Sequence, residues 1–250
     1  MGNWESEASN WIRWARTPGH DSYWYYRDAF FSGTCPAPGR LTLDLCCGEG
    51  RVARDLAERG HPVIGVDLSP TLISAAREAD PGGRYVLADA SALPFLDATF
   101  DLVVAYNSLM DVDDLDGTVA EASRILEGGG RLAISITHPT TEAGRFADRE
   151  PDAPFVISGS YLDPQRRAEG TFERDGLVMT FRHRCYPLEV YAEALRRAGF
   201  VIERLREPAA GDEALRVYGP SEIRWTRVPL FLHVLARKDA LTPSLDRRIA

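Results

Sequence analysis

Hydrophobic residues along the chain form short apolar runs, and between them apolar and polar residues alternate at helical spacing. Seven runs predict strands, at Leu41–Leu45, Pro62–Asp67, Arg84–Leu87, Phe100–Tyr106, Arg131–Thr137, Phe200–Arg206 and Val228–Ala236. The intervening segments predict helices, at Arg51–Arg59, Pro70–Glu78, Asp113–Leu126 and Pro187–Ala198. This alternation favours a doubly wound α/β fold, a mostly parallel seven-stranded sheet with helices on both faces.

Two regions depart from this rhythm. Residues 3–31 are rich in aromatic side chains and predict two helices, separated by Thr17–Gly19. Residues 138–186 contain no clear strand–helix unit, but Asp175-Gly176 between two apolar runs predicts a hairpin. We therefore expect one domain over residues 1–250. Its parts are a helical lid at 1–38, a ligand-binding core at 39–137, a substrate-cover insertion at 138–186 and the rest of the sheet at 187–250.

Composition narrows the class of protein. The formal net charge is -8 and no long basic stripe is present, which disfavours a nucleic-acid partner. No apolar run approaches the roughly 18 residues of a membrane span, and the N-terminal residues lack the pattern of a secretory signal. The four cysteines form no C-x-x-C pair, which fits a protein of the reducing cytoplasm. The oligomeric state is left open.

A glycine-rich turn follows the first predicted strand and opens the first predicted helix. Gly48, Gly50 and Ala53 make a G-x-G-x-x-A pattern, in which glycine lets the backbone approach a ligand. Taken alone, this pattern also fits an NAD-dependent oxidoreductase.

Three carboxylates near the ends of the first three strands sharpen the prediction. Asp67 can accept hydrogen bonds from both ribose hydroxyls of a nucleoside, and its charge would repel a 2′-phosphate. Helix capping is the alternative role, but Ser69 already fills the capping position. Asp44 has an alternative role in bonding loop amides, and Asp89 in a local Asx turn.

These motifs, with the runs FDLVVAYNSLMDV and RILEGGGRLAIS, resemble class I S-adenosylmethionine (SAM)-dependent methyltransferases. The resemblance covers 41–137 closely and 187–236 in outline. It implies a Rossmann-like sheet, SAM as cofactor and methyl transfer as the reaction. One position departs from the family pattern, because this chain has Cys46 where the family usually has glycine.

The resemblance also implies a role for each cofactor-binding residue. Gly48 and Gly50 pack against the methionine part of SAM, and Asp67 holds the ribose. Leu68 flanks the adenine, whose amino group donates to Asp89.

The remaining cofactor contacts come from later in the core and from the lid. The resemblance implies that the Ala90 backbone N–H serves an adenine nitrogen, and that Tyr106 and Asn107 face the sulfonium. In similar methyltransferases an N-terminal helix closes over SAM, which points to Tyr23 and Arg27 here. Plain packing of the aromatic stripe is the alternative for these two residues.

The acceptor must be aligned with the methyl group, and any proton it loses must be removed. His138 directly follows the fifth strand and is the first candidate base, with a loop histidine bonded to backbone as the alternative. His20, Tyr23 and Asp111 are further candidates. We expect His183, in the hairpin, to have a surface or structural role.

A metal site is the less favoured interpretation of the acidic run Asp111–Asp114. Such a run could ligate a cation, as in a catechol-type O-methyltransferase. Asp113 and Asp114 are more simply the acidic start of a helix, so we expect no metal.

The acceptor class is indicated only broadly. An aromatic lid and a phenylalanine-containing insertion suggest a small aromatic or apolar metabolite. The run HDSYWYYRDAFF with the later THP resembles natural-product tailoring enzymes, and more narrowly those that methylate carbon 3 of the indole in tryptophan-derived cyclic dipeptides. Other O- or N-methyltransferases of natural products, and a non-catalytic SAM-binding regulator, stay as alternatives. A nucleic-acid amino methyltransferase is disfavoured, because the chain has YNSL where those enzymes have a Pro-Pro-aromatic run.

Overall fold

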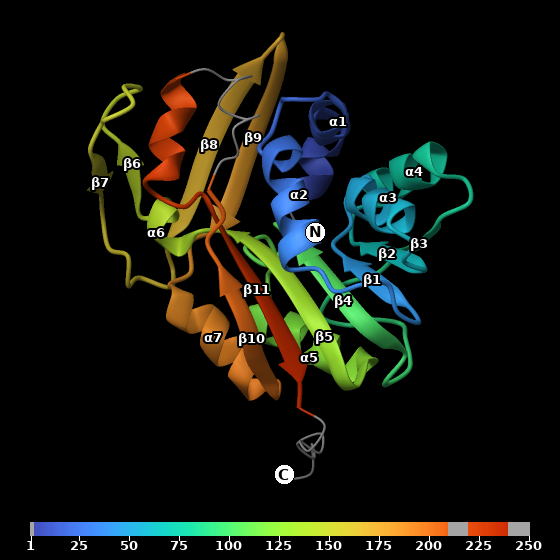
Figure 1. Ribbon diagram of the computed structural model, residues 1–250. Helices are drawn as coiled ribbons and strands as arrows, with labels where there is room; N and C mark the ends of the chain where they lie inside the picture. Colours follow the sequence, from blue (N-terminus) through green and yellow to red (C-terminus); the bar gives the residue numbers. More distant parts are fainter. Residues whose placement is uncertain (1–2, 210–219, 240–250) are drawn as a thin grey trace.

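A computed structural model describes residues 3–209 and 220–239, and a seven-stranded sheet lies at its centre (Figure 1). The strands are β1 (Thr42–Leu45), β2 (Val63–Asp67), β3 (Arg84–Leu87), β4 (Phe100–Tyr106), β5 (Leu126–Thr137), β10 (Phe200–Arg206) and β11 (Phe231–Lys238). Their order is β10-β11-β5-β4-β1-β2-β3. The five neighbouring strands β5, β4, β1, β2 and β3 are parallel to one another. Strand β11 is antiparallel to both of its neighbours, β5 and β10. The predicted fold class is confirmed.

Helices cover both faces of the sheet. They are α1 (Asn3–Arg16), α2 (Tyr23–Gly33), α3 (Arg51–Glu58), α4 (Pro70–Ala79), α5 (Leu115–Ile125), α6 (Pro139–Glu142) and α7 (Leu188–Arg197), with a 3-10 helix η1 (Pro220–Thr226). Strand β4 shows how one strand serves two cores, because successive side chains point to opposite faces. Val103 packs with the α5 and α7 side chains, whereas Leu102 and Val104 pack with α2 and α3.

Several element boundaries differ from the prediction for local reasons. The helix expected from Asp113 begins at Leu115, because the Asp114 carboxylate accepts from the Gly117 N–H at 2.9 Å and caps it. Strand β5 begins at Leu126, since it continues through the glycine run. The final strand begins at Phe231, three residues later than expected.

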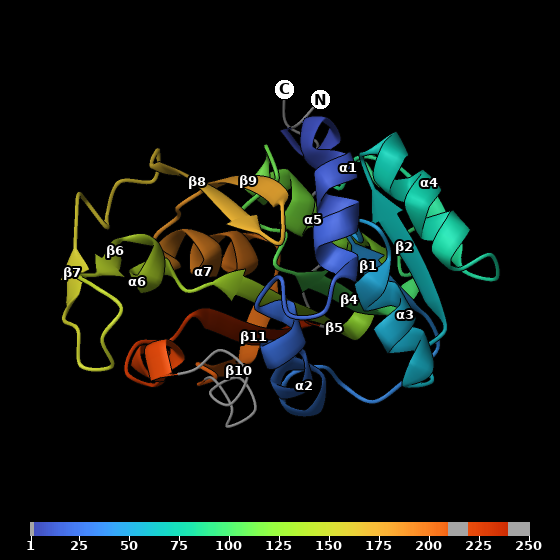
Figure 2. The same cartoon turned by 90° about the horizontal axis from the view of Figure 1, so that it is seen from above.

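The insertion after β5 contains four short strands, of which the sequence predicted two. These are β6 (Gly144–Phe146), β7 (Phe155–Ile157), β8 (Arg167–Arg174) and β9 (Leu177–Arg184). The β8–β9 hairpin is confirmed, with Asp175 and Gly176 at φ 50° and 73°, as a type I′ turn requires. It stands above the sheet beside α1 (Figures 1 and 2). No helix in the described residues is long and apolar enough to cross a membrane.

Candidate active site

A cavity of about 660 Å³ lies at the carboxyl ends of the parallel strands. Its cofactor half is formed by the ends of β1 to β4 and includes Asp44, Cys46, Gly48, Asp67, Leu68, Asp89, Ala90, Tyr106 and Asn107. Its acceptor half comes from α1, α2, the hairpin, the turn before β11 and the loop after β4. That half includes Trp14, His20, Tyr25, Tyr26, Asp111, Phe172, Phe181, His183, Trp225 and Phe231.

The glycine turn of the cofactor half depends on left-handed backbone at Cys46, Gly48 and Gly50, with φ of 59°, 57° and 85°. Cys46 thus adopts a left-handed conformation that glycine takes up freely, at a cost of about 1–2 kcal/mol for a residue with a Cβ. A Cβ at Gly48 would lie 3.3 Å from Trp11 Nε1, so α1 lies directly over this turn. The turn and α1 together form one wall of the cofactor half.

Asp44 is a buried acid beneath the turn. Its Oδ2 accepts no hydrogen bond from any described residue. Burial, and then the charge of Asp67, raise the pKa of Asp44 to about 8. A buried carboxylate with an unused oxygen is suited to a cationic ligand, whose charge would offset the desolvation.

Asp67 and Asp89 both line the cavity, but they differ in how they are held. Asp67 is fixed by backbone donors, accepting from the Gly48 N–H and the Ser69 N–H, each at 2.9 Å. Burial raises its pKa despite these bonds. Asp89 Oδ1 accepts from both the N–H and the hydroxyl of Ser91 at 2.8 Å, which is the Asx turn given above as its alternative role. Leu68, 47% exposed, also lines the cavity.

The loop after β4 completes the cofactor half. Asn107 adopts φ 50°, and its Oδ1 accepts from the Ser135 hydroxyl at 2.6 Å. The Tyr106 ring is buried against Tyr23 and Phe30, with ring centroids 5.2 and 4.9 Å apart. Both predicted residues line the cavity, and neighbouring elements fix them in place.

Helix α1 is pinned across the cofactor half by ion pairs that the sequence analysis missed. Glu49, 1% exposed, pairs with Arg16 of α1 and with Arg54, each at 2.9 Å. The sequence feature that could have indicated this role is the position of Glu49 between the two glycines of the turn. Glu5 of α1 also accepts from Ser69 at the start of α4.

The lid assignment needs a correction at Arg27. Arg27 pairs with Asp55 at 3.2 Å and is not among the residues that line the cavity. Arg51 lines it instead, pairs with Asp21 at 2.7 Å, and lies 4.1 Å from the Tyr23 ring centroid. The Tyr23 hydroxyl donates to Asp55 at 2.6 Å, and burial raises its pKa. Tyr23 thus contributes its ring to the wall but does not present a base.

His138 also needs a correction, because both of its ring nitrogens are engaged outside the cavity. Nδ1 accepts from the Thr140 N–H at 3.1 Å, which caps α6, and Nε2 lies 2.9 Å from Glu207 Oε1. Thr137 lines the cavity, and the next residue along an extended strand points away from it. The alternative, a histidine bonded to local backbone, describes His138 better than the role of base.

His20 is buried and lines the acceptor half. Its Nε2 lies 3.0 Å from Asp175 at the hairpin tip, while Nδ1 has no hydrogen-bond partner among the described residues. The ring packs edge-on against Trp14 at 5.0 Å. The turn between α1 and α2 is therefore joined to the hairpin above the cavity.

Asp111 and His183 both line the acceptor half, and their charges interact. Burial raises the pKa of Asp111 to about 7, close to the value that suits a general base at neutral pH. His183 comes from the distant hairpin, where the sequence gave no sign of a role in the site.

The comparisons with known proteins agree with this geometry. The family described as "Methyltransferase domain" matches residues 43–134. A demethylmenaquinone methyltransferase of Renibacterium salmoninarum is 32% identical over 104 residues, which is 41% of this chain and 44% of that protein. A malonyl-[acyl-carrier protein] O-methyltransferase of Enterobacter lignolyticus is 33% identical over 48% of this chain and 50% of its own length. The match thus spans about half the length of these curated relatives.

Similarity to a solved structure extends over most of the chain. The crystal structure of an S-adenosylmethionine-dependent methyltransferase from Mesorhizobium loti is 27% identical, with a TM-score of 0.68. The alignment covers 87% of this chain and 98% of that one. The chain therefore has the Rossmann-like fold of methyltransferases, and it is similar to SAM-dependent methyltransferases in both sequence and structure.

Proposed function

We propose that this protein methylates a small metabolite with an aromatic or apolar body, and that Asp111 removes the proton that the acceptor loses. The observation that carries the proposal is the composition of the acceptor half. Its walls are rings from α1, α2, the hairpin and η1, and they surround only a few polar groups. Such a pocket stabilises an apolar ligand by burial, while its polar groups set orientation.

The cofactor half fits SAM in charge and shape. SAM supplies an electrophilic methyl group on a sulfonium, and this cation suits the carboxylates of Asp44 and Asp67. The glycine turn lets the methionine part approach the backbone, and α1 excludes water above it. The residues proposed to hold SAM are those of the cofactor half.

Asp111 is the best-placed base among the four candidates. His138 faces elsewhere, and the Tyr23 hydroxyl is committed to Asp55. His20 lines the cavity but is tied to the hairpin tip. Asp111 follows Met110 in the loop after β4, which also carries Asn107 of the cofactor half, and all three residues line the cavity. For an indole acceptor, the ring supplies the electrons, and the proton leaves when a neighbouring amide nitrogen traps the iminium.

An acceptor panel tests the proposal. We would incubate the chain with SAM and tryptophan-derived cyclic dipeptides, small phenols, a demethylated naphthoquinol and a malonyl thioester, with amino acids and oligonucleotides as polar comparisons. Release of S-adenosylhomocysteine should occur with aromatic or apolar acceptors. Release only with the polar set would overturn the assignment of acceptor class, and NAD-dependent oxidation without methylation would overturn the reaction.

A further inference from the structure

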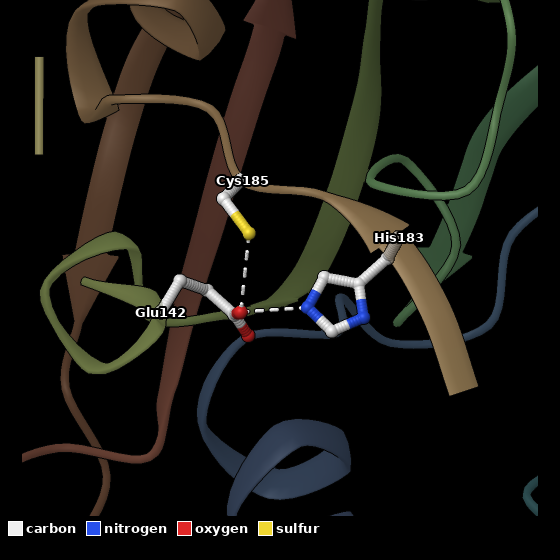
Figure 3. Close-up of side chains that lie close together, drawn as sticks. All are labelled: Glu142, His183 and Cys185. Carbon is white, nitrogen blue, oxygen red and sulfur yellow. Dashed lines mark hydrogen bonds and ion pairs between the residues drawn. The ribbon is translucent and has the colours of Figure 1, made fainter. Parts of the chain in front are cut away.

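Three side chains of the insertion, Glu142, His183 and Cys185, lie close together, and His183 lines the acceptor half (Figure 3). Glu142, at the end of α6, accepts through Oε2 from His183 Nε2 at 2.6 Å. The Cys185 thiol donates to the same oxygen at 3.5 Å. The Glu142 and His183 side chains are only 13% and 19% exposed, so water screens their attraction weakly.

This cluster is fastened to the loop that carries Asp111. The Arg184 N–H donates to the Met110 carbonyl at 3.0 Å, so the end of β9 runs beside that loop. His183 and Asp111 both line the cavity, whereas Glu142 and Cys185 do not. Glu142 contacts the imidazole from behind, and Nδ1 points away from it (Figure 3).

We infer that Glu142 and His183 are a positioning pair that keeps Asp111 ionised beside the acceptor, so that Asp111 can take the acceptor's proton at neutral pH. This inference rests on the proposed role of Asp111. Glu142 holds a proton on the imidazole, and the imidazolium stabilises the carboxylate of Asp111. The acceptor attacks the methyl carbon, and the carbon–sulfur bond pair leaves with the sulfur. Asp111 takes the proton that the acceptor loses, which for an indole comes from the amide nitrogen that traps the iminium. Asp111 then returns the proton to solvent.

The electrostatics of the cavity wall agree with a protonated His183 beside an ionised Asp111. Burial alone would lower the pKa of His183, but hydrogen bonds with Cys185 and Glu142 and the charges of Glu142 and Asp111 raise it to about 10. The charge of His183 in turn lowers the pKa of Asp111, against burial and the charges of Glu142 and Asp67.

Other groups surround Asp111, but the test below leaves them in place. Trp4 of α1 donates a hydrogen bond to its carboxylate. Cys46 of the glycine turn and Tyr191 of α7 are close enough for Asp111 to raise their pKa values. Removal of His183 alone should therefore raise the pKa of Asp111.

A metal ion is the competing explanation for the cluster. Within the described part of the chain, Glu142, His183 and Cys185 are the group whose ligand atoms lie close enough together, within 4.8 Å, to hold one. Carboxylate, imidazole and thiolate are ligands that zinc takes. The 2.6 Å contact between Glu142 and His183 is instead that of a hydrogen bond, because two zinc ligands stand farther apart.

The test is a carboxyl titration of the apoprotein by carbon-13 NMR after aspartate labelling, with Asp111→Asn to assign the signal. His183→Gln should raise the titration midpoint of Asp111 by about one pH unit or more, and Glu142→Gln should raise it less. His138→Gln is the matched control, because His138 also pairs with a glutamate but lies outside the cavity; it should leave the midpoint unchanged. An unmoved midpoint in His183→Gln would overturn the inference, as would stoichiometric zinc in the purified protein.

Turnover separates this inference from the proposed function. If Asp111 is the base, His183→Gln should lower kcat about tenfold near pH 6.5 and recover above pH 9, where the carboxylate ionises without help. SAM affinity should not change. If Asp111→Asn keeps full turnover, the base assignment is wrong whatever the NMR midpoint shows. A loss in His183→Gln that is equal at every pH would indicate a merely structural role.

Discussion

The two halves of the cavity are built in different ways. The cofactor half comes from consecutive strand ends, and its key contacts involve backbone: the left-handed turn at Gly48, and Asp67 bonded to two N–H groups. The acceptor half is assembled from the N-terminal helices, a hairpin and the segment before β11, and side-chain rings form most of it. The first half is therefore set by local sequence and the second by long-range packing, so substitutions should affect the two functions separately.

The largest separation should come from Asp111→Asn. This change removes the proposed base and keeps the side chain's shape, so turnover should fall roughly 10²–10⁴-fold, the usual contribution of a general base. Calorimetry should show SAM affinity within about twofold of wild type, because the cofactor half is untouched. Equal losses of turnover and of SAM binding would contradict the separation.

Asp67→Ala should have the opposite signature. It removes the proposed ribose acceptor and two hydrogen bonds that hold the glycine turn and the loop after β2, so SAM binding should weaken by about 2–4 kcal/mol. Asp28→Ala is a suitable control, because Asp28 is 82% exposed and its pair with Arg59 is 3.4 Å long. An unchanged dissociation constant in calorimetry would remove Asp67 from the ribose role.

This contrast explains what the sequence could predict. Gly48, Asp67 and Asn107 were predicted to bind the cofactor because each stands at a strand end within a local motif, and all three line the cavity. His138 was misplaced although it follows a strand, because the alternation of the strand and the capping of α6 turn its ring away. His183 was expected to have a surface or structural role, and it lines the cavity because the hairpin packs against the Met110 loop. Arg51 lines the cavity in place of Arg27 because α3 packs against α2, a long-range contact that the sequence does not reveal.

The pH dependence of SAM binding should report on the cofactor half alone. The pKa of Asp44 is raised to about 8 in the free protein, so the carboxyl is largely protonated at pH 7. A cationic ligand favours the ionised form, so SAM binding below pH 8 releases a proton. Affinity should therefore rise up to about tenfold from pH 7 to 9 and then level off. Calorimetry in buffers of different ionisation enthalpy measures the proton release; no release at pH 7.5 would contradict the role of Asp44.

The smallest expected effect lies in the acceptor half. Phe172 of the hairpin lines the cavity yet is 52% exposed, so Phe172→Ala should leave folding intact. Loss of its partial burial should raise the KM for an apolar acceptor about 5- to 10-fold, equivalent to roughly 1 kcal/mol. Val178→Ala, on the same hairpin and 47% exposed, is the matched control away from the cavity. A change in SAM affinity in Phe172→Ala would show that the two halves are not separate.

Transfer of an isotopic label tests the central claim most directly. The chain is incubated with SAM carrying a deuterated methyl group and with the acceptor that gives S-adenosylhomocysteine in the panel. Mass spectrometry should show the intact deuterated methyl group on the acceptor, in a one-to-one ratio with S-adenosylhomocysteine, and Asp111→Asn should suppress both products together. SAM that binds but keeps its label with every acceptor, or an acceptor that is converted without gaining the label, would contradict the assignment of this cavity to methyl transfer.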